Sequence, residues 1–373
     1  MGNTVKPQIG HHIPMTDAKI RKENHALRTV TAILMFFIAG AHYYSKATVE
    51  GVMVNDFIFD AGRFAIPILI LTSGYFSYSS DGHVEARMGL KLRHILYLIV
   101  IYKLFYLLFS TILLLAGKVD AQYILMEFLV YSPSVEFDCY NGVTGLESTQ
   151  PIWFIYALFA IYVLWWILYK LKIDYIWTLI IAIPIVIVSL ILGEFLPIAG
   201  VRYIGDTYIF DIADILYPFI LLPFFIMGYY MHKHSGWLDD KISNAAVWGL
   251  IALGTAMTFT EVYLVGDSSA IFMGSIVLAF SLFLGTFRVP EDRYRIGPLI
   301  YIGRNLTMWM YVFFGAACLI MRWALEPYAD DYWLCEVAGP FLAVLLDLAM
   351  ALAFHLLLVF VGRRMASAKR HSF

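Results

Sequence analysis

ILYLIVIYKLFYLLFSTILLLA fills residues 95–116 and contains one charged side chain, Lys103. A helix that crosses the hydrocarbon core of a bilayer needs about 20 mostly apolar residues, so this stretch predicts a membrane-spanning helix. The whole chain has the same character, with 61% hydrophobic and 14% charged residues among 373. A soluble domain carries about 25% charged residues. The sequence therefore predicts an integral membrane protein.

The same length criterion predicts about ten spans along the chain. They lie at residues 28–46, 56–77, 95–116, 151–169, 174–193, 211–230, 246–264, 270–287, 298–321 and 338–361. A backbone in lipid has to satisfy its own hydrogen bonds, and segments of this length do so as helices rather than as barrel strands. The predicted fold class is all-α, a polytopic transmembrane helix bundle.

The distribution of basic residues predicts the orientation of the bundle. With the N-terminus inside, 18 of the 26 Lys and Arg residues fall in cytoplasmic segments and 4 fall in outer segments. Positive charge accumulates on the cytoplasmic side of membrane proteins, so both termini are predicted to be cytoplasmic. The expected organisation is a cytoplasmic segment at 1–26, a single transmembrane domain at 27–362 and a basic cytoplasmic tail at 363–373.

Arg28 and His42 are the first candidates for function, because ionisable groups in spanning helices are costly and usually functional. They are 14 residues apart, which places them about 40° from the same helix face and roughly 21 Å apart along the axis. They can therefore line one tunnel without touching each other. Two structural alternatives stay open: Arg28 can snorkel to the headgroups, and His42 can hydrogen-bond a neighbouring loop.

Other ionisable residues in the spans are weaker candidates. Arg63 falls in the outer half of the second span, and Asp211 and Asp214 begin the sixth span at the outer face. These three can form a polar site for a substrate or an internal ion pair, and the ion pair is the favoured interpretation. Asp347 and His355 are about 80° apart around the last span, and we interpret both as structural.

Motifs for metals, phosphate loops and serine hydrolases do not occur in the sequence. It has no His-Glu-x-x-His, no Gly-rich phosphate loop and no Gly-x-Ser-x-Gly elbow. We expect no metal site, no tightly bound cofactor and no nucleic-acid partner. A disulfide between Cys139 and Cys335, both predicted to lie outside, stays open because sequence does not show proximity.

Several short segments, taken in order, resemble the landmarks of one family. They are the first span with Arg28 and a following His, IPILILTSGYF at 66–76, KLRHIL at 91–96, PIWFI at 151–155, PFFIMGYY at 223–230 and IGRNL at 302–306. In this order and helix count they resemble the acyltransferase-3 family of integral-membrane acyltransferases, including its surface-polysaccharide O-acyltransferases. The resemblance covers nearly the whole chain.

The resemblance implies a reaction. Such a protein takes an acyl group, often acetyl, from cytoplasmic acyl-CoA and passes it to a hydroxyl of a cell-envelope glycan or lipid-linked sugar. Acyl-CoA is then a co-substrate, and the location is a bacterial inner (plasma) membrane. His42 is expected to be catalytic, either as the base for the acceptor hydroxyl or as a transient acyl carrier. A histidine suits both roles because it is neutral near pH 7.

The resemblance also assigns binding residues. The catalytic and donor-binding residues are expected to be His42, Arg28, Arg87, Lys91, Arg93, Ser73 and Tyr75. From their place in the predicted spans, and not from the resemblance, the substrate-binding (acceptor-binding) candidates are Arg63, Trp153, Asp211 and Asp214. The positive charge at the cytoplasmic end of the spans has a simpler explanation too, the general basic bias of cytoplasmic segments.

Two departures from the family pattern keep other functions open. The family usually has ten residues between the first-helix Arg and His, whereas thirteen separate Arg28 from His42. The late His of the ninth span is missing, and WMYVF stands at 309–313. The alternatives are a transporter or exporter of a sugar or polysaccharide precursor, or a non-catalytic member of an export assembly. A homo-oligomer is compatible with each of them.

Overall fold

The computed structural model describes residues 24–43, 48–49, 52–53, 61–78, 84–117, 153–173, 175–201, 203–205, 207–234, 242–265, 272–289, 297–328 and 331–371. Its α-helices are α1 (His25–Ala41), α3 (Ala65–Tyr75), α4 (Val84–Leu115), α7 (Trp153–Lys170), α8 (Tyr175–Leu190), α9 (Leu196–Ile198), α10 (Ile209–Lys233), α12 (Asn244–Val265), α13 (Met273–Phe287), α14 (Pro298–Asn305), α15 (Thr307–Leu325) and α16 (Gly339–His371). Short 3-10 and π segments add η2 (Gly62–Phe64), η3 (Ile191–Phe195), η6 (Glu326–Tyr328) and η7 (Trp333–Ala338).

Helices make up nearly all of the described chain, which confirms the all-α class. The described strands form two minimal antiparallel hairpins, β1 (Thr48–Val49) with β2 (Val52–Met53) and β3 (Tyr203–Ile204) with β4 (Thr207–Tyr208). Within the described residues, four helical stretches are long and apolar enough to cross a membrane: Arg87–Leu115, Asn244–Leu264, Thr307–Tyr328 and Trp333–Arg364. The chain is therefore a membrane protein, while the count of ten spans and the cytoplasmic termini remain predictions.

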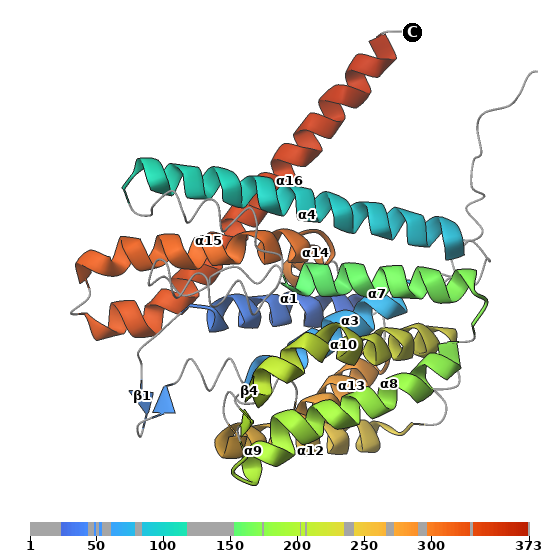
Figure 1. Ribbon diagram of the computed structural model, residues 1–373. Helices are drawn as coiled ribbons and strands as arrows, with labels where there is room; N and C mark the ends of the chain where they lie inside the picture. The colour runs from blue at the N-terminus through green and yellow to red at the C-terminus, as the bar shows by residue number, and fades with distance from the viewer. Residues whose placement is uncertain are drawn as a thin grey trace, which may run out of the picture.

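The first helix, α1, lies inside the bundle. It packs against α14, α15 and α16, and against α3 and α13. In Figure 1, α4 runs along one edge of the bundle, α8 and α12 run along the opposite edge, and the last turns of α16 project beyond it. On α4, Leu104 and Leu108 are 60% and 62% exposed. Such an outward apolar face fits a helix that is surrounded by lipid.

Two glycines allow α3 and α10 to touch backbone to backbone. A Cβ at Gly74 would fall on the carbonyl oxygen of Phe225, and a Cβ at Gly228 would fall on that of Leu71. The contact is therefore reciprocal between the two helices. Small residues at helix crossings let backbones approach closely in membrane proteins. In the Ser-Gly-Tyr sequence that ends α3, the glycine, Gly74, is thus explained by its close contact with α10.

We expect Gly74→Ala and Gly228→Ala each to lower the free energy of unfolding by about 1–3 kcal/mol, the usual cost of overpacking. Gly249→Ala in α12 is the matched control, because a Cβ there meets no atom within 4 Å. A mid-helix Gly→Ala exchange without a clash gains up to about 1 kcal/mol. Thermal unfolding in detergent measures the difference. Equal melting temperatures for Gly74→Ala and Gly249→Ala would contradict the close crossing.

Candidate active site

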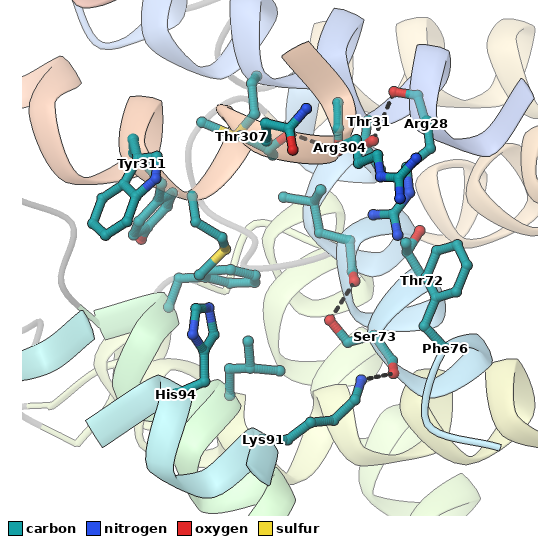
Figure 2. Close-up of a pocket in the computed structure, with 18 of the residues that line it drawn as sticks. Arg28, Thr31, Thr72, Ser73, Phe76, Lys91, His94, Arg304, Thr307 and Tyr311 are labelled. Atoms are coloured by element: carbon teal, nitrogen blue, oxygen red, sulfur yellow. Dashed lines mark hydrogen bonds between the residues drawn. The ribbon is translucent and has the colours of Figure 1, made fainter. Parts of the chain in front are cut away.

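A cavity of about 440 Å³ opens among α1, α3, α4, α7 and the segment from α14 to α16. This volume is in the usual range for a small-molecule site. Figure 2 shows most of its lining side chains. The lining residues are Arg28, Thr31, Met35, Leu69, Thr72, Ser73, Phe76, Lys91, His94, Phe154, Leu158, Gly303, Arg304, Asn305, Thr307, Met308, Trp309, Tyr311 and His355.

A break between α14 and α15 forms one wall of the cavity. The helix α14 ends at Asn305, and Leu306 separates it from α15. The Thr307 hydroxyl donates a hydrogen bond to the Gly303 carbonyl at 3.1 Å, which satisfies a carbonyl left over at the end of the helix. Gly303 lies against the backbone of α1, where a Cβ would fall on the Arg28 carbonyl oxygen. This contact places Arg304 beside Arg28.

The cavity is strongly cationic. Arg28 and Arg304 enter from one side, and Lys91 and His94 enter from the other (Figure 2). None of the described residues that line it is acidic. A site of this kind favours a polyanion, because guanidinium and ammonium groups form their strongest hydrogen bonds with phosphate or carboxylate oxygens.

Aromatic and backbone contacts hold two of these cations in place. The Arg28 guanidinium carbon lies 4.1 Å from the centroid of the Phe76 ring. The Lys91 ammonium donates to the Tyr162 hydroxyl at 3.2 Å and to the Ser73 carbonyl at 3.4 Å. An ammonium carries three N–H donors, so a further one remains for a ligand. Both side chains are therefore oriented before a ligand arrives.

Three of the donor-binding residues predicted from sequence line this cavity: Arg28, Lys91 and Ser73. The other three predicted donor-binding residues do not line it. Arg87 donates to the Tyr78 carbonyl at 2.8 Å, and Arg93 is exposed on α4. Tyr75 is 1% exposed and stacks on His232 with ring centroids 4.2 Å apart.

The predicted acceptor-binding residues lie elsewhere or outside the described side chains. The Arg63 guanidinium carbon lies 5.3 Å from the centroid of the Phe272 ring, away from the cavity. The side chains of Trp153, Asp211 and Asp214 are outside the described part of the structure, although their backbones belong to α7 and α10. The acceptor site thus stays a prediction.

His42 caps the C-terminal end of α1, and its ring lies back against the last turn of that helix. Its Nδ1 lies 2.8 Å from the Ile38 carbonyl oxygen, and its ring meets the edge of Phe314 at a centroid distance of 4.8 Å. A carbonyl accepts only, so Nδ1 carries the proton and the lone pair of the neutral ring is at Nε2. His42 does not line the cavity, which ends on α1 at Met35.

The structure adds site residues that the sequence interpretation missed: His94, Arg304, Asn305 and His355. His94 is three residues after Lys91, and residues at that spacing share a helix face. The segment KLRHIL therefore contained the spacing that identifies His94 as a neighbour of Lys91. No comparable signal existed for His355, because its position depends on how α16 packs. Among the described residues, no group of three or more His, Cys, Asp or Glu side chains is arranged to hold a metal ion.

Comparison with models of known protein families finds a match over residues 24–360 to a family described as an acyltransferase domain. The match begins just before Arg28 and ends after His355, so it contains every residue that lines the cavity. No curated protein and no solved structure matches the chain.

Proposed function

The chain belongs to the acyltransferase-3 family, and on that basis we propose that it is an O-acyltransferase that uses acyl-CoA. The acyl group, such as acetyl, would come from the cytoplasm. The acceptor would be a hydroxyl of a cell-envelope glycan or lipid-linked sugar. The proposal includes a single transmembrane domain at 27–362 with about ten spans and cytoplasmic termini, in a bacterial plasma membrane.

The cationic cavity is the observation that carries this proposal. Coenzyme A is a polyanion with a diphosphate and a further phosphate on its ribose. Arg28, Lys91 and Arg304 offer three cations to such a group, with no described acidic side chain in the lining. Arginine forks bind phosphate oxygens in pairs, and a lysine adds a point charge. These three cations support the proposal that the cavity holds the nucleotide end of acyl-CoA.

The position of the cavity agrees with a cytoplasmic donor. In the predicted topology, α1, α4 and α14 begin on the cytoplasmic side, and α3 ends there. These are the helix ends that supply Arg28, Lys91, Arg304 and Ser73 to the cavity. Helices of opposite direction thus bring their cytoplasmic ends to one place, where acyl-CoA is available.

His42 lies at the opposite end of α1 from Arg28, which is the outer end in the predicted topology. We propose that its Nε2 takes the proton from the acceptor hydroxyl while the hydroxyl oxygen attacks the thioester carbonyl. The carbon–sulfur bond then breaks, the new ester forms, and the coenzyme A thiolate receives the proton from the imidazolium. The hydrogen bond from Nδ1 to the Ile38 carbonyl keeps the ring in the tautomer that this step needs.

Acceptor-dependent release of coenzyme A tests the function. We expect the protein, purified in detergent and given acetyl-CoA, to release free thiol faster when a suitable surface glycan or lipid-linked sugar is present. The acylated acceptor should be visible by mass spectrometry. Absence of turnover over a broad acceptor panel, together with no binding of acetyl-CoA, would instead support a transporter or a non-catalytic member of an export assembly.

A further inference from the structure

A closed stretch separates the cavity from His42. Met35 lines the cavity and is 1% exposed. It precedes His42 by seven residues, which places the two about 20° apart around α1 and roughly 10 Å apart along its axis. Since the cavity ends at Met35, an acyl group held by a donor in the cavity has to pass one further layer of side chains before it meets His42.

A series of aromatic rings leads from the cavity wall into that layer. Tyr311 lines the cavity, and its ring contacts Phe154 at a centroid distance of 5.1 Å and Phe314 at 5.6 Å. Phe314 in turn meets the His42 ring at 4.8 Å. Phe314 is 0% exposed and does not line the cavity. A continuous series of ring contacts thus leads from the cavity wall to His42, and Phe314 is the member that touches the histidine.

We propose that Phe314 determines the length of the acyl chain that this enzyme transfers. This inference rests on the proposed acyltransferase function and assigns a specificity residue to it. The Phe314 ring occupies the space beside His42 that the acyl group has to enter. A short acyl group needs little of that space, whereas each further methylene requires more of it. Interiors are close-packed, so a chain that overlaps the ring is rejected.

The neighbouring Phe313 provides a matched control. Its ring contacts Phe105 at 4.7 Å and Phe354 at 5.3 Å. It is buried like Phe314, at 4% exposure, but faces α4 and α16 and has no described ring contact with His42. Exchange of either Phe for Ala removes the same atoms. Only the exchange at 314 creates space next to His42.

The test compares kcat/KM for acetyl-, butyryl- and hexanoyl-CoA in the wild-type enzyme and its variants. We expect the wild type to prefer acetyl-CoA. In Phe314→Ala, the ratio of hexanoyl to acetyl turnover should rise by about 10-fold or more, as expected when a pocket gains room for methylenes. Phe314→Leu removes fewer atoms, so it should raise the same ratio by a smaller factor. This variant provides the test if Phe314→Ala does not fold. Phe313→Ala should leave the ratio unchanged.

The outcomes of this test distinguish a failure of the Phe314 inference from a failure of the proposed acyltransferase function. An unchanged ratio in a folded Phe314 variant of an otherwise active enzyme would overturn the inference and leave the acyltransferase function intact. The same shift in Phe313→Ala would also overturn it, because the effect would then reflect general loosening. If the wild type turned over no acyl-CoA of any length, the proposed function and this inference would both fall.

Discussion

Replacement of His42 by Ala is expected to reduce kcat for acyl transfer by about 10²–10⁴-fold, the usual contribution of a positioned general base. The acyl-CoA dissociation constant should change little, because His42 lies outside the cavity that holds the cations. The reason for the loss is specific: the variant lacks the Nε2 lone pair that accepts the hydroxyl proton. Steady-state release of coenzyme A with saturating acceptor measures the effect.

His234→Ala is the control for His42→Ala. His234 is exposed at the end of α10, where its ring stacks on Tyr230 at a centroid distance of 6.3 Å. We expect it to retain wild-type turnover. A folded His42→Ala protein with wild-type kcat would show that His42 is not the base, and the two histidines that line the cavity, His94 and His355, would then be the candidates to test.

The second large effect is expected from the paired arginines. Arg28→Gln and Arg304→Gln should each raise KM for acyl-CoA by about 10–100-fold, since a hydrogen bond to a charged group is worth about 1.5–3 kcal/mol and 1.4 kcal/mol is tenfold in affinity. In the double variant, KM for acyl-CoA should rise by about 10²-fold or more. The turnover number at saturating donor should fall much less, because neither guanidinium is placed at the reacting carbonyl.

Arg93→Gln is the control for the two arginines. Arg93 belongs to the same basic segment as Lys91 but is exposed on α4 and does not line the cavity. Its exchange removes the same charge two residues after Lys91 and should leave KM within about twofold of wild type. If Arg93→Gln weakened donor use as much as Arg28→Gln, general surface charge and not the cavity would be responsible.

The sequence predicted the helices well because apolar segments of membrane length can do little else in a bilayer. Residues 95–115 of the predicted span 95–116 fall within α4, and each predicted span overlaps a described helix. The sequence could not predict the boundary at Leu306, where IGRNL ends α14 and the chain starts again as α15. The apolar pattern continues through that break, so 298–321 read as one span.

The site was predictable only where side chains share one helix. Arg28 could be identified from its place in α1, but its neighbour Arg304 is brought to it by the contact of Gly303 with the α1 backbone. That contact depends on tertiary packing. The spacing of Arg28 and His42 predicted that both line one tunnel, but only Arg28 lines the cavity, and the His42 ring lies at the Ile38 carbonyl.

Asp347 shows the limit of interpreting a polar residue as structural. The sequence suggested a structural role, for which a hydrogen-bond partner is expected. The side chain is 0% exposed in α16, and neither carboxyl oxygen has a hydrogen-bond partner in the described part of the chain. A buried polar group without such a partner costs about 1–3 kcal/mol on the mutational scale. The structural interpretation of Asp347 therefore lacks the contact that would explain it.

The most direct measurement is equilibrium binding of acetyl-CoA compared with S-acetyl-pantetheine, which has the same thioester and no phosphate. If the cavity formed by Arg28, Lys91 and Arg304 holds the nucleotide end, acetyl-CoA should bind at least about 10²-fold more tightly, and Arg28→Gln/Arg304→Gln should remove most of that difference. Equal binding of the two thioesters to the wild type, or no saturable binding of acetyl-CoA, would contradict a donor site in this cavity.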